Sequence, residues 1–78
     1  MSGLTKRSFS LAGHRTSVAL EPEFWSALGA IASERGQTLS ALVTAVDAER
    51  LEGQTLASTL RVLALTHFVG AVNHLERI

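Results

Sequence analysis

Apolar and polar residues alternate most clearly over Arg15–Leu20, and this period of two predicts a β-strand that runs directly into Pro22. Side chains along a strand point alternately to its two faces. A lone strand is not stable in water, so this one must pair with a second copy of itself or with the weaker alternation of Arg7–Leu11. One face holds Thr16, Val18 and Leu20, and the other holds Arg15, Ser17 and Ala19.

Two amphipathic segments after the strand predict helices. The first runs from Pro22 to about Arg35, because proline suits the first position of a helix and Gly36 suits the residue beyond its end. Its apolar residues recur at helical spacing, which places them on one face. The second helix begins after Thr38, a favourable N-cap residue, and is expected to end at Gly53.

A third helix is predicted from just after Thr55 towards Val72 or beyond, and apolar residues surround most of it. A helix that is apolar on several sides must be covered on more than one of them. The chain has 78 residues, 46% of them apolar, and its mean hydropathy is +0.23. So short a chain forms only a thin core. A second copy is the simplest cover for the third helix, and we therefore expect a homodimer.

Charge is distributed unevenly although the formal net charge is zero. Residues 1–20 carry a net charge of +3 without any acid, residues 21–53 carry −4, and residues 54–78 carry +1. A zero total argues mildly against nucleic-acid binding. A dimer that joined its amino-terminal segments would nevertheless gather six positive charges on one side.

Several classes of function lack their chemistry in this sequence. There is no cysteine, which excludes disulfides and thiolate metal sites. His67 and His74 have no third ligand at metal-binding spacing, and there is no nucleophile motif or phosphate-binding glycine loop. We expect no metal, no cofactor and no enzymatic activity. Leu56–Leu75 is too polar to cross a membrane and no signal-peptide pattern is visible, so a cytoplasmic, nucleoid-associated location is expected.

The order of these elements resembles that of the ribbon-helix-helix DNA-binding proteins: a strand, a helix, a glycine-containing turn, and a second helix that opens with a small hydroxyl residue. The resemblance covers about Arg15–Gly53 and is best over residues 18–24 and 36–43. The whole chain looks like a small bacterial subfamily with an added carboxy-terminal helix. It implies a mainly α fold with a short amino-terminal strand, in an intertwined homodimer with an intermolecular antiparallel β-ribbon. The expected segments are a basic arm with a possible extra strand (1–14), the ribbon-helix-helix domain (15–53) and a helix completing the dimer core (54–78).

The resemblance also implies roles for single residues, since a ribbon of this kind enters the DNA major groove. The residues expected to contact bases are Arg15, Ser17 and Ala19. The residues expected to contact the DNA backbone are Lys6 and Arg7 in the arm, and Thr38, Leu39 and Ser40 at the start of the second helix. The expected dimer core is Thr16, Val18, Leu20, Phe24, Trp25, Leu28, Leu42, Val46, Leu60 and Leu63.

The function that this resemblance implies is a bacterial transcription regulator, a repressor that binds double-stranded DNA with full or partial sequence specificity. Its dimers would be able to cooperate on DNA. One alternative is a dimerisation or adaptor module that binds another protein through its carboxy-terminal helix, which the zero net charge and Ala19 in the reading face favour. An antitoxin ranks third, because toxin-binding tails are usually charged and disordered, whereas Leu56–Leu75 is apolar and predicted helical.

Overall fold

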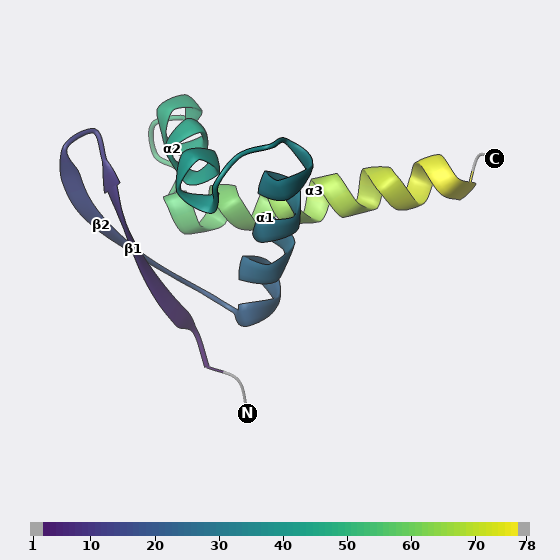
Figure 1. The fold of residues 1–78 in the computed structure, drawn as a ribbon, viewed down its shortest axis with the longest axis horizontal. Coiled ribbons are helices and arrows are strands. Elements are labelled where there is room, and N and C mark those ends of the chain that lie inside the picture. The colour runs from purple at the N-terminus through teal and green to yellow at the C-terminus, as the bar shows by residue number, and fades with distance from the viewer. Residues whose placement is uncertain (1–2, 77–78) are drawn as a thin grey trace.

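The structure, a computed structural model, describes residues 3–76, with side chains through residue 71. Two strands, β1 (Thr5–Leu11) and β2 (His14–Leu20), precede three helices, α1 (Pro22–Glu34), α2 (Leu39–Glu49) and α3 (Leu56–Glu76). Figure 1 shows the two strands as a curved hairpin at one end of the molecule, with the carboxy-terminal half of α3 projecting beyond the other helices at the opposite end. The mainly helical fold with an amino-terminal strand segment is therefore confirmed.

The hairpin is formed within one chain. Strands β1 and β2 are antiparallel, from Thr5 opposite Leu20 to Leu11 opposite His14. The loop between them is Ala12-Gly13, and both residues have positive φ, 50° and 81°. A type I′ turn requires this at its two central positions, and its twist matches the twist of the flanking strands.

Pairing within the chain answers one question that the sequence left open. The weaker segment Arg7–Leu11 is part of a full strand, so the amino-terminal arm becomes half of a hairpin from Thr5 onwards. The expectation that β2 needs a second copy as its partner loses its premise, because β1 already occupies one of its edges. The intermolecular ribbon stays a prediction that must rest on other features.

Helix α1 and the start of α2 lie where their capping residues predict. Pro22 starts α1, and Gly36 follows it with a φ of 66°. The side chain of Thr38 accepts a hydrogen bond of 3.0 Å from the amide of Ala41, which confirms Thr38 as the N-cap of α2.

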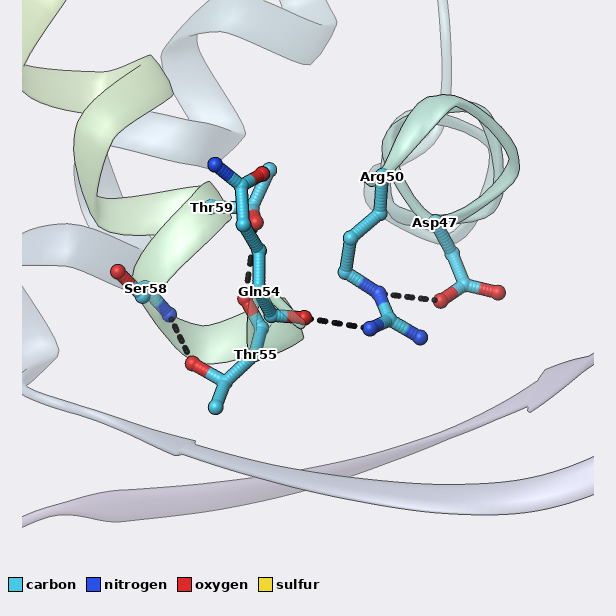
Figure 2. Close-up of polar contacts among 6 residues, drawn as sticks. All are labelled: Asp47, Arg50, Gln54, Thr55, Ser58 and Thr59. Atoms are coloured by element: carbon cyan, nitrogen blue, oxygen red, sulfur yellow. Dashed lines mark hydrogen bonds and ion pairs between the residues drawn. The ribbon is translucent and has the colours of Figure 1, made fainter. Parts of the chain in front are cut away.

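The end of α2 differs from the sequence prediction. The helix stops at Glu49 and Arg50 caps it, so Gly53 lies in the turn beyond, and Leu51 is 67% exposed. Figure 2 shows the polar contacts in this connection: the guanidinium of Arg50 donates to the carboxylate of Asp47 (3.3 Å) and to the carbonyl of Gln54 (2.5 Å). Two bonds from one side chain fix where the backbone leaves the helix.

Helix α3 begins after Thr55, as predicted, and the side chain of Thr55 accepts a hydrogen bond of 3.0 Å from the amide of Ser58 (Figure 2). Its first half enters the core through Leu56, Leu60 and Ala64. One apolar core joins both strands and all three helices, so the three predicted segments of the chain share it. Its buried members are Phe9, Leu11, Val18, Leu20, Trp25, Leu28, Ile31, Ala32, Leu42, Val43, Leu56, Leu60 and Ala64.

Candidate nucleic-acid interface

The face of the hairpin that points away from the core is polar and basic, and we call it the outer face. The alternation of side chains places Arg15, Ser17 and Ala19 of β2 on it, as the sequence predicts. The register adds three residues of β1, which lie directly opposite: Lys6 across from Ala19, Ser8 across from Ser17, and Ser10 across from Arg15. The outer face is therefore Lys6, Ser8, Ser10, Arg15, Ser17 and Ala19.

Ser8 and Ser17 lie at the middle of the outer face, where their hydroxyl oxygens are 3.0 Å apart and share a hydrogen bond. This cross-strand pair lies between the two cations, Lys6 towards the open end and Arg15 towards the turn. No acidic residue occurs between Thr5 and Leu20. The outer face thus offers donors and positive charge without a competing carboxylate.

Lys6 and Arg7, expected together in a basic arm, lie on opposite faces of β1 because they are neighbours in a strand. The guanidinium of Arg7 lies over the indole ring of Trp25, 5.5 Å from its centroid, on the side of the hairpin that faces the helices. Trp25 is 4% exposed, and its Nε1 donates a 2.7 Å hydrogen bond to the carbonyl of Thr5. Trp25 and Arg7 together join the start of β1 to α1.

The amino terminus of α2 has the chemistry expected of a backbone contact. The amide of Ala41 donates to the side chain of Thr38. The amides of Leu39 and Ser40 come too early in the helix to have an intrahelical carbonyl partner. Ser40 is exposed and Leu39 is half-buried against the core. Amides at this end also carry the positive end of the helix dipole, which favours an anion such as phosphate.

A sequence model of the ribbon-helix-helix domain matches residues 4–68, which span both strands and most of the three helices. The chain belongs to the ribbon-helix-helix family. Its members are generally DNA-binding transcription regulators, and the fold is a non-enzymatic regulatory one.

One solved structure is similar to this ribbon-helix-helix chain over nearly its whole length. It is that of an uncharacterized protein from Bordetella pertussis Tohama I, with a TM-score of 0.85 and 33% sequence identity. The match covers 92% of this chain and 61% of that one, so the chain spans less than two thirds of its length. No protein of curated function matches this chain.

Most residues expected in the dimer core lie in the core of the single ribbon-helix-helix chain. Val18, Leu20, Trp25, Leu28, Leu42 and Leu60 are buried there. Phe24, Val46 and Leu63 are partly buried against them, and Thr16 is intermediate. Whether any of them also touches a second copy stays a prediction.

Helix α3 instead exposes a set of apolar side chains that the core does not use. Val62 is 58% exposed, Leu65 63%, Phe68 44% and Val69 47%. Residues 62, 65 and 69 lie at i, i+3 and i+7, on one side of the helix, and residue 68 lies beside them. We call these four residues the α3 stripe.

Two polar contacts join α3 to α1 and its N-cap residue Glu21. Arg61 donates through Nε to Glu21 Oε1 at 3.0 Å, and its guanidinium lies 5.8 Å from the centroid of the Phe24 ring. The pKa of Glu21 lies below its ordinary value of 4.5, first because its own backbone N–H donates to the carboxylate and then because Arg61 does. His67 Nε2 lies 2.8 Å from Glu34 Oε2.

His67 is thus engaged in a contact between helices, and the side chain of His74 lies outside the described residues. Within the described part of the chain, no three His, Cys, Asp or Glu side chains come together as a metal site would require. No described helix combines the length and apolar character needed to cross a membrane.

Sequence reasoning missed Ser8 and Ser10 as members of the outer face. Their place depends on the register of β1 against β2, and the register depends on the two-residue turn at Ala12-Gly13. The signal was present in the sequence as Gly13 between two alternating segments. Ala12 weakens the prediction of a two-residue turn, because a non-glycine residue with positive φ is uncommon.

Proposed function

We propose that this protein is a bacterial transcription regulator that binds double-stranded DNA through the outer face of its hairpin and represses by occupying a site that polymerase needs. The observation that carries this proposal is the outer face itself, where Lys6 and Arg15 flank hydroxyl groups on two strands that contain no acid. Membership of a family of DNA-binding regulators supports it.

The dimensions of the hairpin fit this role. The major groove is about 12 Å wide and admits a two-stranded ribbon, whose outward side chains then meet base edges. Arg15 has the geometry to donate two parallel hydrogen bonds to guanine, a contact worth roughly 1–3 kcal/mol of discrimination. Ser17 donates or accepts, and Ala19 offers only a methyl contact to thymine.

The start of α2 would hold the DNA backbone through Thr38, Leu39 and Ser40. Free amides at a helix amino terminus bind phosphate without reading sequence, so they set the register of the protein on the duplex. Such contacts make affinity depend on salt.

A second copy of the chain is part of the proposal, and the α3 stripe supports it. Four large apolar side chains on one helix, each 44–63% exposed, form an apolar surface of the kind that marks interaction sites. Two copies would bring two outer faces and two α2 amino termini to one DNA site.

Fluorescence anisotropy with labelled random duplex DNA tests the proposal directly. Affinity should fall steeply with salt, with a slope of about 0.9 per neutralised phosphate in a plot of log affinity against log salt. Arg15→Ala should weaken binding, whereas Arg50→Ala, which removes the same charge at the far end of α2, should not. Absence of binding at low ionic strength, or an equal loss of DNA affinity in the two variants, would contradict the proposal.

The second candidate is an adaptor function, in which the α3 stripe binds another protein in place of a second copy of this chain. The α3 stripe begins at Val62, beside the core residues Leu60 and Ala64, and continues to Val69; its side chains are 44–63% exposed and so are accessible to another protein. Under this alternative, the double variant Lys6→Ala, Arg15→Ala keeps partner binding and phenotype. Under the DNA-binding proposal it loses both DNA binding and repression.

A further inference from the structure

The outer face has one position on β2 at which the side chain is too small to read a base. Ala19 ends at its methyl group, so it offers no hydrogen bond to the floor of a groove. Across the ladder from Ala19 stands Lys6, the second residue of β1. A longer polar side chain therefore lies beside the position that β2 leaves without a donor.

Lys6 and Ala19 are close enough for their side chains to face the same base pair. Side chains directly opposite in an antiparallel pair have Cβ atoms about 4.5–5.5 Å apart. The lysine side chain has four methylene groups, so its ammonium group extends well past the methyl of Ala19. Lys6 is exposed, and both residues point away from the core.

The hairpin differs from the intermolecular ribbon that the sequence suggested, because both of its strands come from one chain. Neighbouring strands lie about 4.8 Å apart, so two of them fit within a major groove about 12 Å wide. In that arrangement β1 lies as deep in the groove as β2. Its outward side chains then meet bases and not only the phosphates at the rim.

We propose that Lys6 is a specificity-determining residue, which donates to the O6 and N7 atoms of guanine at the base pair that faces Ala19. This assignment rests on the proposed DNA-binding function and extends the reading set to β1, with Ser8 beside Ser17 in the next cross-strand pair. Lysine has the donor chemistry that these two acceptors require. Arg7, one residue along, takes no part in reading, because its guanidinium lies over Trp25 on the other face.

The neighbouring cations make a matched experiment. Lys6→Met and Arg7→Met each remove one positive charge and keep an unbranched apolar side chain of similar length. The full chain and both variants are used to select bound fragments from random duplex DNA. The selected motifs are then compared, and affinities are measured for duplexes that differ at one base pair.

The wild-type protein should select a motif with a guanine that Lys6→Met no longer prefers. Discrimination at that base pair should drop by about 5- to 150-fold, the equivalent of one specific base contact, while the rest of the motif persists. Arg7→Met should select the wild-type motif.

Three other outcomes would overturn the assignment, and they differ from one another. If Lys6→Met binds all sequences more weakly by the same factor and keeps the full motif, Lys6 contacts only phosphate. If Arg7→Met instead loses the preference for guanine at that base pair, the cation that contacts the base is Arg7, on the other face of the hairpin. If the wild-type chain binds no duplex, the DNA-binding function itself fails and takes the role of Lys6 with it. Circular dichroism of both variants checks that the fold is retained.

Discussion

Replacing Trp25 with phenylalanine removes a hydrogen bond between α1 and the start of β1. The indole Nε1 donates to the carbonyl of Thr5 at 2.7 Å, while the ring packs against Phe9 with centroids 5.9 Å apart. Trp25→Phe keeps an aromatic ring in the core and deletes the donor.

The expected loss has two parts. A typical net contribution of one hydrogen bond is about 0.5–1.5 kcal/mol. The smaller ring also leaves apolar volume unfilled at a site that is only 4% exposed, which costs roughly a further 1 kcal/mol. The free energy of unfolding should fall by about 2 kcal/mol in total. For a domain of this size, the melting temperature should drop by roughly 8–16 °C.

Urea unfolding measures the total loss of stability. Amide hydrogen exchange shows where along the chain the structure opens more readily. Trp25→Phe should raise exchange most at the start of β1, because the strand is no longer attached there. Phe9→Leu is the matched control, since it removes the ring contact and leaves the hydrogen bond in place. Equal exchange at the start of β1 in the two variants would refute the role of this hydrogen bond.

Three further changes have defined outcomes. Val18→Asp should unfold the chain, because Val18 is 5% exposed in the core and a buried charge without a partner is costly; a folded variant by circular dichroism would show that β2 is misplaced. Ala12→Asn should raise the free energy of unfolding in urea by about 0.5–1 kcal/mol, because Asn-Gly suits two positive-φ positions; a loss of stability would argue against the type I′ turn. The pKa of Glu21 is lowered in the folded state, so its stabilising effect should be present above about pH 4.5 and disappear as the pH falls below that value. Arg61→Met should reduce this acid-dependent loss in a melting series, and an unchanged pH profile would contradict the ion pair.

The sequence predicts those features that depend only on contacts between residues a few positions apart. The starts of the three helices follow from Pro22, Thr38 and Thr55, because capping is a contact between near neighbours. The faces of β2 follow from alternation alone. These predictions required no knowledge of the rest of the fold.

Features that depend on distant residues could not be predicted in the same way. Arg7 interrupts the apolar face of β1, and this makes the strand look weak in the sequence. Its guanidinium lies over the ring of Trp25, which is eighteen residues further along the chain. The sequence predicts that the second helix ends at Gly53, because glycine is a common helix terminator. The chain leaves the helix before Leu51, where Arg50 binds Gln54 (Figure 2).

The zero net charge of the chain is compatible with DNA binding once the charges are placed on the fold. All three cations of residues 1–20 belong to the hairpin, and two of them, Lys6 and Arg15, lie on the outer face. Every acid follows Leu20, in α1, α2, α3 or the connections, and the helices pack against the other face of the hairpin. At physiological salt, charges more than about 8 Å apart are largely screened when they are exposed to solvent. A phosphate at the outer face therefore responds to Lys6 and Arg15 far more than to the sum over the chain, which is why the distribution of charge outweighs its total.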